Sequence, residues 1–544
     1  MLRKIAWLGT SVSMAQGEGG GEDVATAKMG SVATAQGASG RERALLWLGS
    51  VPALFFLIMV LLPPLNHDVA AVLDFSQRWL DGGQLYETLI DVNPPLIFIL
   101  NLIPAAIAKW TPLSGPQAVL LCLLAHAFML WRMTIALRAG RAEGPVEATV
   151  LAACIPLLIL LAGSDFGQRE VIMATTAIPY ALLAARRIEG PPVSLRLTLA
   201  VAVAAALAFA LKPHFLAVPL LVELLILRRL GLARALRDPV PAVMAAIWLL
   251  YLASIPLFFP AYFRFVVPLA WEVYADIHGA GPLSVLVTEL MGAAAVLMLL
   301  VLPFALRRGS GALSHALAAA TAGAFLSAWV QHKGWTYHVL PITILACATA
   351  VAAASRWLDQ ALPGARARLA APAMAAIAAF GIGAYAIRGG ETPWRQFWFN
   401  TEQAGRLTQW LQREVAGGSL LVLSPEILPV YPAVNYAHAR LTLRTMSIWL
   451  LQGAYRTCPA GPAPYRDPQQ MGPAEALMYR SVGEDFDRRP PHAVLVSRFP
   501  WMRGCGNRFD LIAYFTRNPL FARHWPRYRL VGEMEGYRLF VRTR

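Results

Sequence analysis

The chain has 544 residues, of which 57% are apolar and only 15% are charged. No soluble protein of this length needs so many long uncharged segments, so the composition predicts a polytopic membrane protein. The formal net charge of +15 does not point to nucleic acid, because the arginines concentrate in short loops between apolar segments. Such clustering is typical of loops on the cytoplasmic side of a membrane.

The N-terminal segment differs in composition from everything that follows it. It is rich in Gly, Ala and Ser and shows no lasting apolar periodicity. Such a segment buries too little apolar surface to offset chain entropy, so we predict a disordered cytoplasmic tail over residues 1–43. The apolar run at residues 5–8 is too short for the core of a signal peptide.

Residues 44–388 are predicted to form a transmembrane domain. We count eleven candidate spans, several of them short for a full crossing, and a polar break at Lys212-Pro213-His214 separates two of them. The spans cover residues 44–64, 117–137, 146–163, 170–185, 196–211, 214–228, 241–259, 283–305, 313–330, 338–354 and 369–387.

The basic residues predict the orientation of these spans. Fourteen arginines fall in the loops that we place inside, whereas six basic residues fall in the short loops that we place outside. This bias puts the first long loop and the C-terminal segment on the outer side. The inner set is Arg138, Arg141, Arg186, Arg187, Arg196, Arg228, Arg229, Arg234, Arg237, Arg307, Arg308, Arg356, Arg366 and Arg368, and the outer set is Arg78, Lys109, Arg169, Lys212, Arg264 and Lys333.

The first outer loop, residues 66–116, begins with an acid and a surface helix. Asp68 is the first acid after the first span, and apolar residues recur at near-helical spacing as far as Leu80. This pattern predicts an amphipathic helix on the membrane surface, ended by Asp81-Gly82-Gly83. Pro94-Pro95 is well placed to open the next helix, because proline has no N–H to leave unpaired.

Asp68 and Asp91 therefore lie at either side of one surface loop. Each carboxylate also has a simpler interpretation. Asp68 could cap its surface helix, because Asp is a favoured N-cap residue. Asp91 could be a turn former before the prolines.

The other outer loops gather cations, imidazoles and aromatic rings on the same side as these two acids. Ionisable groups at membrane depth are costly and mark function more often than packing. Lys and Arg suit a phosphate, whereas Trp and Tyr suit a sugar ring or the lipid interface. The loops contribute Asp165, Gln168, Arg169, Glu170, Lys212, His214, Tyr262, Arg264, Trp271, Glu272, Tyr274, Asp276, His278, Gln331, His332, Lys333, Trp335, Tyr337 and His338.

These loop residues have alternative interpretations as well. Trp335 and Tyr337 could belong to an interfacial aromatic belt, and lysines at span ends could extend to lipid headgroups. Arg169 and Glu170 could form a plain ion pair at a helix start. The histidines His67, His332 and His338 could bind a metal, although they lack a tight ligand spacing. The conjunction of all these groups on one face favours a site over any single alternative.

Residues 389–544 are predicted to form a small soluble α/β domain outside the membrane. Charge is scattered here, prolines are frequent and the apolar runs are short. Residues 403–415 have a helical pattern, and residues 420–423 and 493–496 are short apolar runs. Residues 528–531 and 538–541 are expected to pair as late strands. The segment is long enough to fold as a unit.

The cysteines agree with this placement. Cys458 and Cys505 are the only two in the soluble domain, where an oxidising periplasm favours a disulfide between them, although they could also remain apart. The other three, Cys122, Cys154 and Cys347, fall inside predicted spans, where a thiol behaves as a small apolar group.

The first outer loop also carries a resemblance to a known family. An acid just after the first span, a surface helix and then Asp91-Val92-Asn93-Pro94-Pro95-Leu96 resemble the first outer loop of GT-C membrane glycosyltransferases. The likeness is greatest to protein O-mannosyltransferases and the lipid A aminoarabinose transferase. Asn93 departs from the pattern, since those enzymes have His or Lys at that position, which leaves donor and acceptor chemistry open.

The resemblance implies a bundle of about eleven transmembrane helices with amphipathic juxtamembrane helices and a sugar donor on a polyprenyl-phosphate carrier. It places the catalytic carboxylate on Asp68 and the second loop acid on Asp91. It also implies a periplasmic glycan or lipid-linked acceptor and a place in the bacterial inner membrane. No cofactor is assigned, and the use of a divalent metal ion stays open.

The residues fit this chemistry independently. A polyprenyl phosphate is a good leaving group if cations receive its charge, so one base is sufficient. Asp68 is expected to be that base in an inverting displacement, oriented by Asp91 or by a loop cation. We expect the phosphate at Arg169, Lys212, Lys333 and Arg264, and the sugar or acceptor at His67, Asn93, His332, Trp335, Tyr337 and His338.

Two other classes of function share some of these features. A transporter or flippase of a lipid-linked glycan would also be polytopic, but no internal repeat and no charge run at mid-membrane is evident in the sequence. A non-catalytic subunit of envelope polysaccharide assembly could use its soluble domain to hold enzymes.

Overall fold

The computed structural model describes residues 40–190, 192–274, 281–362, 364–389, 394–461, 463–502 and 504–543. Residues 1–39 of the predicted tail lie outside this description, as do Asp276 and His278. The first helix begins at Gly40, slightly before the predicted boundary of the tail.

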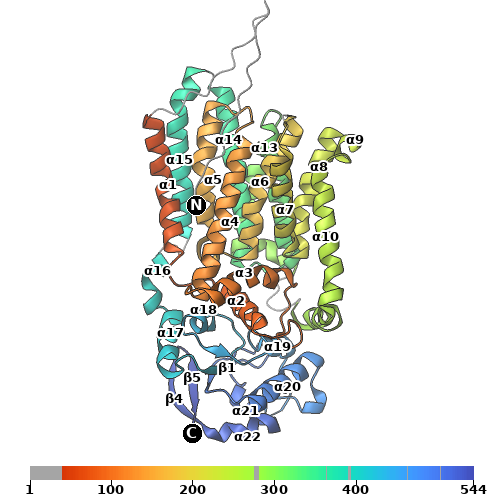
Figure 1. The fold of residues 1–544 in the computed structure, drawn as a ribbon, viewed down its shortest axis with the longest axis vertical. Helices are drawn as coiled ribbons and strands as arrows, with labels where there is room; N and C mark the ends of the chain where they lie inside the picture. Colours follow the sequence, from red (N-terminus) through yellow and green to blue (C-terminus); the bar gives the residue numbers. More distant parts are fainter. Residues whose placement is uncertain are drawn as a thin grey trace, which may run out of the picture.

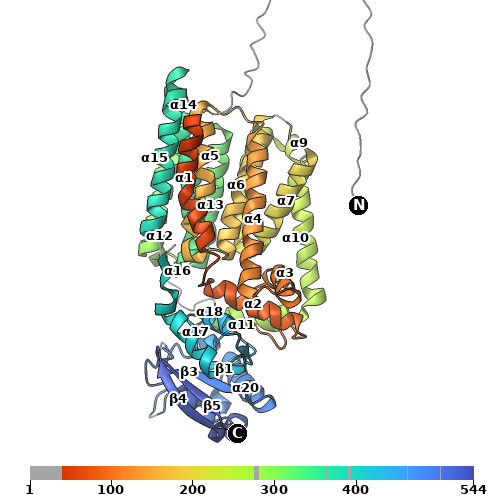
Figure 2. The same ribbon diagram turned by 60° about the vertical axis from the view of Figure 1, so that its left-hand side comes forward.

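The N-terminal two thirds of the chain form a helical bundle. Most of its long helices run side by side along the long axis of the molecule, as Figures 1 and 2 show. Its elements are α1 (Gly40–Met59), α2 (His67–Leu80), α3 (Leu96–Trp110), α4 (Gly115–Arg138), α5 (Pro145–Leu157), η1 (Leu158–Asp165), α6 (Arg169–Glu189), α7 (Leu195–Ala210), η2 (Pro213–Leu216), α8 (Ala217–Leu230), α9 (Leu232–Ala235), α10 (Pro239–Phe258), η3 (Tyr262–Val266), α11 (Val267–Leu269), η4 (Ala270–Tyr274), η5 (Ser284–Val287), α12 (Glu289–Ala305), α13 (Gly311–Gln331), α14 (Thr336–Ala361) and α15 (Ala365–Gly389).

Seven helical segments of the described chain are long and apolar enough to cross a membrane. They are α4, α5 with η1, α6, α10, α13, α14 and α15 as far as Ile387, and α3, α7 and α12 are shorter apolar helices. Each of the eleven predicted spans overlaps a helical segment. The chain is therefore a membrane protein, and eleven crossings remain a prediction.

Small residues allow these helices to pack closely. Gly323 of α13 faces the backbone of α8, where an added Cβ would lie 2.5 Å from the Cα of Val218. A side chain at this position would force the two helices apart. Alanine-rich faces, such as Ala316, Ala320 and Ala324 of α13, are fully or almost fully buried.

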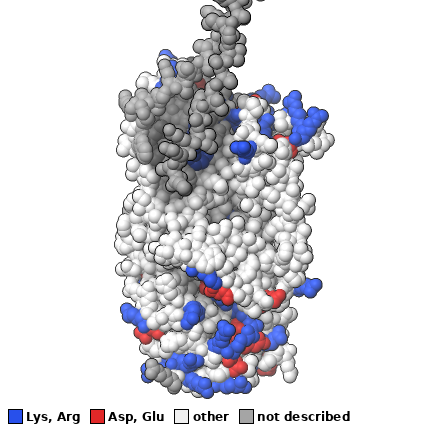
Figure 3. Space-filling model, viewed as in Figure 1, with Lys and Arg blue, Asp and Glu red and all other residues white. Residues whose placement is uncertain are grey.

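The loops assigned to one side do gather at one end of the bundle. Arg141 pairs with Glu189 at 3.0 Å, and Arg356 pairs with Glu147 at 2.9 Å. At the opposite end, α2 and α3 lie across the bundle, and the C-terminal domain packs beneath them (Figure 1). On the face drawn in Figure 3, the charged side chains that are visible gather near the two ends and leave a broad uncharged belt between them.

The C-terminal part of the chain contains a five-stranded sheet with helices. The strand order is β2-β1-β3-β5-β4, with β1 parallel to β2 and β3, and β5 antiparallel to β3 and β4. The predicted strands and the predicted helix at residues 403–415 are confirmed. The elements are α16 (Trp394–Trp398), η6 (Phe399–Thr401), α17 (Gln403–Glu414), β1 (Ser419–Leu423), α18 (Val430–Tyr436), β2 (Arg440–Leu441), α19 (Trp449–Ala454), η7 (Pro468–Gln470), α20 (Pro473–Arg488), β3 (Ala493–Ser497), α21 (Leu511–Thr516), α22 (Pro519–His524), η8 (Trp525–Arg527), β4 (Tyr528–Met534) and β5 (Tyr537–Arg542).

The two cysteines of this domain are joined in the structure. The sulfur atoms of Cys458 and Cys505 lie 2.03 Å apart, and the Cα atoms lie 4.8 Å apart. Both values are those of a disulfide bond.

Candidate active site beneath the helical bundle

The surface helix α2 is capped by a residue that leaves Asp68 free for other contacts. The side-chain oxygen of Asn66 accepts hydrogen bonds from the backbone N–H groups of Asp68, at 3.0 Å, and Val69, at 3.3 Å. Asn66 is thus the N-cap, and the capping interpretation of Asp68 is wrong. The predicted amphipathic helix itself is confirmed.

The carboxylate of Asp68 is held from two sides. Gln168 donates from Nε2 to Asp68 Oδ2 at 2.8 Å and to Asn66 Oδ1 at 3.1 Å. His67 Nε2 lies 3.7 Å from the other carboxylate oxygen. The Asp68 side chain keeps 17% of its surface exposed, so it remains accessible to a reacting hydroxyl.

Asp91 is buried and builds the turn before the prolines. Its Oδ1 atom accepts from the backbone N–H of Asn93 at 2.8 Å and from Asn93 Nδ2 at 2.7 Å. Tyr86 donates from its hydroxyl to the Asn93 carbonyl at 2.6 Å. The turn-forming interpretation of Asp91 therefore holds, and the turn presents the side chain of Asn93 to Arg169, which donates to Asn93 Oδ1.

Arg169 links the two acids electrostatically. Burial raises the pKa of Asp68, but the charges of His67 and Arg169 and the Gln168 hydrogen bond outweigh it, so the net pKa is lowered. For Asp91, burial dominates and the pKa is raised, although the Asn93 bonds and Arg169 oppose the shift. Asp68 is therefore the stronger acid of the pair and carries its charge more readily.

A glycine shapes the loop that delivers Arg169. Gly167 has φ +91°, which side chains rarely adopt, and an added Cβ would lie 2.7 Å from Leu123 Cδ1 and 3.2 Å from Val69 Cγ2. The chain thus turns tightly against α2 and α4 and places Gln168 and Arg169 opposite Asp68.

A second group of site residues surrounds Glu170. Lys212 donates from Nζ to Glu170 Oε1 at 2.5 Å, and His338 Nε2 lies 3.9 Å from the same oxygen. Lys212 also lies over the ring of Tyr337, 5.5 Å from its centroid. Trp335 stacks on His338 at 5.2 Å between centroids, and Lys333 Nζ lies 4.7 Å from the Trp335 centroid. These contacts link most of the predicted cations and aromatic rings.

Two predicted site residues lie apart from this assembly. Arg264 is exposed in η3, and among the described residues no hydrogen bond or ion pair joins it to the others. The His332 ring contacts the backbone two residues before it, with Nδ1 3.1 Å from the carbonyl of Val330. Asp276 and His278 lie outside the described residues.

Three residues with no predicted role in the reaction hold the site together. They are Asn66, which caps α2 and accepts from Gln168, then Gln168 itself, and Glu170, the partner of Lys212. The polar run Gln168-Arg169-Glu170 after the third predicted span was the available signal. Its partners could not be named, because they come from loops about 40 to 100 positions away.

A cavity of about 620 Å³ begins beside the site. It reaches from Asn66 and His67 along η1, α12, α14 and α15. Leu290 and Tyr385, which line it, are 43% and 58% exposed, so the cavity opens through the side of the bundle. Apolar side chains line most of its length.

The described residues offer no cluster of three or more His, Cys, Asp or Glu side chains that could hold a metal ion. The carboxylates of Asp68 and Asp91 instead contact amide donors or lie close to cations. The organisation of the site rests on charge pairs and hydrogen bonds among its own side chains.

Comparison with solved structures decides the fold. The crystal structure of ArnT from Cupriavidus metallidurans bound to undecaprenyl phosphate superimposes with a TM-score of 0.56, covering 92% of this chain and 98% of that chain at 13% identity. This chain has the fold of ArnT. The apo state of the same protein gives a TM-score of 0.55 at 14% identity, with the same coverage of both chains.

The likeness to ArnT confirms the predicted GT-C fold. The cryo-EM structure of the arabinofuranosyltransferase AftD from Mycobacteria gives a TM-score of 0.42 at 14% identity, covering 92% of this chain and 40% of that chain. No protein-family model matches the sequence, and no curated protein matches it. The ArnT likeness is therefore one of fold, and the reaction has to be argued from the site.

Proposed function

We propose that the chain is a membrane glycosyltransferase that moves a sugar from a polyprenyl-phosphate donor to a periplasmic glycan or lipid-linked acceptor. The observation that carries this proposal is the convergence of Asp68, Asp91, Arg169 and Lys212 at one end of the bundle. A carboxylate base and cations for a leaving phosphate are the two requirements of such a transfer.

The reaction is a single displacement with inversion at the anomeric carbon. Asp68 takes the proton of the acceptor hydroxyl as the acceptor oxygen forms its bond to that carbon. The bond to the phosphate oxygen breaks, and its electron pair leaves with the polyprenyl phosphate. No general acid is required, because the leaving group departs as an anion next to Arg169, Lys212 and Lys333.

The electrostatic arrangement supports these roles. Asp68 has a lowered pKa and is ionised at neutral pH, as a base must be. Asp91 orients Asn93, which in turn holds Arg169 near both acids. Trp335 and Tyr337 supply ring surfaces for a sugar close to Lys212, and the buried ring of His338 packs against both of them. His67 contacts the base directly.

The lateral cavity suits the donor tail. It is mainly apolar, opens through the side of the bundle and ends at Asn66 and His67, next to the base. A polyprenyl chain there would reach the bilayer while its phosphate meets the cations. ArnT, whose fold this chain shares, was crystallised with undecaprenyl phosphate, which supports a carrier of this class.

The proposal is tested with the full chain in proteoliposomes and a panel of polyprenyl-phosphate sugars, with and without periplasmic glycan acceptors. Release of polyprenyl phosphate that depends on acceptor is expected. Movement of intact donor across the bilayer without cleavage would instead indicate a flippase. Neither cleavage nor movement would indicate a role in assembly.

The Asp68→Asn variant tests the base. It should lower turnover by about 10²- to 10⁴-fold, the usual contribution of a general base, while the protein elutes as a single folded species. Asp467→Asn, at a carboxylate 75% exposed in the C-terminal domain, is the matched control and should keep normal turnover. Normal turnover by Asp68→Asn would refute the assignment.

A further inference from the structure

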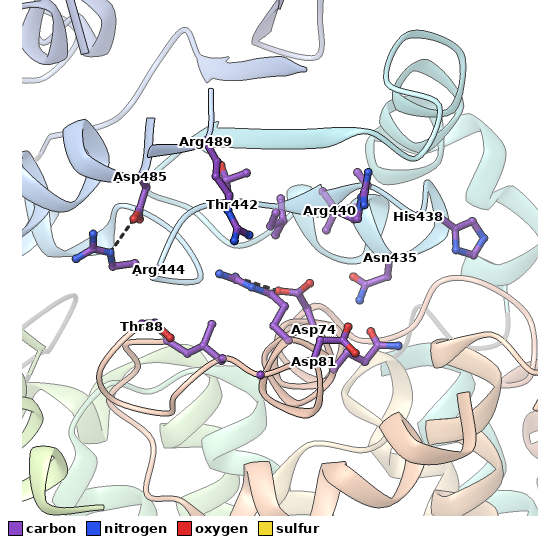
Figure 4. A pocket seen from close by; sticks show the side chains of 18 of the residues that line it. Asp74, Asp81, Thr88, Asn435, His438, Arg440, Thr442, Arg444, Asp485 and Arg489 are labelled. Atoms are coloured by element: carbon purple, nitrogen blue, oxygen red, sulfur yellow. Dashed lines mark hydrogen bonds and ion pairs between the residues drawn. The ribbon is translucent and has the colours of Figure 1, made fainter. Parts of the chain in front are cut away.

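A second hollow lies between α2 and the C-terminal domain, away from the Asp68 site. Its volume is about 720 Å³, and neither Asp68 nor Asp91 lines it. In Figure 4, Asp74, Asp81 and Thr88 lie on the α2 side, and Arg440, Thr442 and Arg489 face them from the C-terminal domain. We call this hollow the arginine cleft, after the five arginines that line it: Arg78, Arg440, Arg444, Arg488 and Arg489.

The acids of the arginine cleft already have cationic partners. Asp485 pairs with Arg444 at 2.7 Å, and Asp74 lies 3.5 Å from Arg78. Asp81 pairs with Lys109 at 2.7 Å. Arg444 also pairs with Glu484 at 2.7 Å, and the charge of Arg488 acts on Asp485. The acids therefore offset part of the positive charge of the cleft, but not all of it.

Three guanidinium groups of the cleft take no part in these ion pairs. Arg440, Arg488 and Arg489 are exposed, and within the described parts of the chain none of them has an ion pair. Three unpaired cations around one hollow create a strongly positive potential. Arginine forks bind carboxylates and phosphates with two parallel hydrogen bonds, so the cleft has the chemistry of an anion site.

The remaining lining residues suit a polyhydroxylated ligand. Gln77, Thr88, Asn435, His438 and Thr442 present amide, hydroxyl and imidazole groups. Among the seven helical segments long enough to cross a membrane, the cleft touches only the first two residues of α4, Gly115 and Pro116. An acyl chain would find no continuous apolar path from there, so these contacts favour a saccharide over a lipid.

The position of the cleft relates it to the proposed reaction. Arg78 lies ten residues after Asp68 on α2, which corresponds to about 15 Å along a helix axis. A single donor sugar at Asp68 cannot span this distance, but an acceptor of several sugar units can. We propose that the arginine cleft binds an anionic saccharide, one that bears carboxylate or phosphate groups, as the distal part of the acceptor. The role of this saccharide as the acceptor rests on the proposed function, whereas the binding of an anion at the cleft does not.

Binding is measured with the full chain in nanodiscs of phosphatidylcholine. The probes are tetragalacturonate for carboxylate, a mannose-phosphate oligosaccharide for phosphate, and methyl-esterified tetragalacturonate as the uncharged control. At least one charged probe should bind at least tenfold more tightly than the ester. The double variant Arg488→Gln/Arg489→Gln should weaken that binding by at least tenfold.

A matched variant separates the cleft from general surface charge. Arg413→Gln/Arg529→Gln removes the same charge from two exposed arginines of the C-terminal domain that do not line the cleft, and it should change the affinity by less than twofold. Equal losses in the two double variants, or equal binding of charged and esterified probes, would overturn the proposal. The proposal would also be overturned if short-chain phosphatidylglycerol bound in a way that depends on Arg488 and Arg489 while neither charged saccharide bound.

The binding measurement is independent of catalysis. The Asp68→Asn variant should bind the charged probe with unchanged affinity. If transfer is absent from the wild-type protein but cleft binding persists, the proposed function fails and the anion site stands. If transfer is present but no charged saccharide binds at the cleft, only the cleft proposal fails.

Discussion

At the scale of single residues, the site depends on one cation, Arg169, that acts on two acids whose pKa values are shifted in opposite directions. Arg169 is 7% exposed and lowers the pKa of both Asp68 and Asp91. The pKa of Asp91 is still raised, because burial outweighs Arg169 and the neutral groups of Asn93 and because the negative charge of Asp68 adds to the effect of burial. Asp68 is thus the readily ionised base, and Asp91 is the acid that is protonated first as the pH falls.

This division predicts the acid side of the pH profile. As pH falls, the pair should take its first proton mainly on Asp91, so kcat/KM should fall with an apparent pKa above the usual carboxyl value. In Asp91→Asn, the kcat/KM that remains should begin to fall only at a lower pH, since Asp68, whose pKa is lowered, is then the acid that controls the fall. An unchanged acid limb in that variant would show that another group controls it.

Asn66 combines two tasks that substitution can separate. Asn66→Ala should lower stability by about 1 kcal/mol through the lost cap, measured as the free energy of unfolding or as a fall in Tm. Asn66→Ser retains a capping hydroxyl and should recover most of that stability. It cannot accept from Gln168 as Asn66 does, so turnover should stay reduced by about tenfold, as small misplacements of a catalytic group do. Full activity in Asn66→Ser would contradict the positioning role.

At the scale of elements, the sequence predicted those helices and strands that are determined by the pattern of neighbouring residues. Apolar spacing predicted α2, the Pro94-Pro95 pair predicted the start of α3, and two short segments near the end of the chain predicted the pairing of β4 with β5. These elements are determined by neighbouring residues. The sequence also predicted that Asp68 and the loop cations lie at one end of the bundle, because apolar spans confine the polar loops between them to the two membrane faces.

Local pattern could not supply partners that are distant in the sequence. The Gln168–Asp68 bond joins residues 100 positions apart, and the Ile90–Arg444 backbone bond joins the first loop to the C-terminal domain. The arginine cleft brings α2, the loop after it and the start of α4 together with residues of the C-terminal domain more than 300 positions later. Such pairings depend on how α2 docks, and no periodicity encodes that.

Helix α12 provides a test of the lateral cavity. Ala293 is exposed and lines the cavity, so Ala293→Trp should obstruct it and raise the KM for a long-chain polyprenyl donor by about tenfold, an effect of about 1.4 kcal/mol. A short-chain, water-soluble donor analogue should be affected less than threefold. Val296→Trp, on the same helix and 57% exposed outside the cavity lining, is the control. Equal KM values for the two variants would argue against a tail in this cavity.

At the scale of the whole molecule, the C-terminal domain holds α2 in place through α18. The Tyr436 hydroxyl accepts from the Leu65 N–H at 3.0 Å, just before α2. The Tyr431 hydroxyl donates to Asp74 Oδ2 at 3.1 Å, within α2. These bonds lie on both sides of the segment that carries Asp68. The domain therefore contributes to the geometry of the site although none of its residues contacts the base in the described structure.

Removing the two hydroxyls tests this coupling. Tyr431→Phe/Tyr436→Phe should destabilise the junction by about 1–3 kcal/mol, since each lost hydrogen bond is worth about 0.5–1.5 kcal/mol. Amide hydrogen exchange in residues 67–80 should then accelerate and kcat should fall, because Asp68 would no longer stay aligned with Gln168 and Arg169. Tyr465→Phe/Tyr514→Phe removes three hydroxyl hydrogen bonds inside the C-terminal domain and should leave exchange in α2 unchanged. If both double variants lower activity equally while α2 exchange stays slow, domain stability rather than the position of α2 limits turnover.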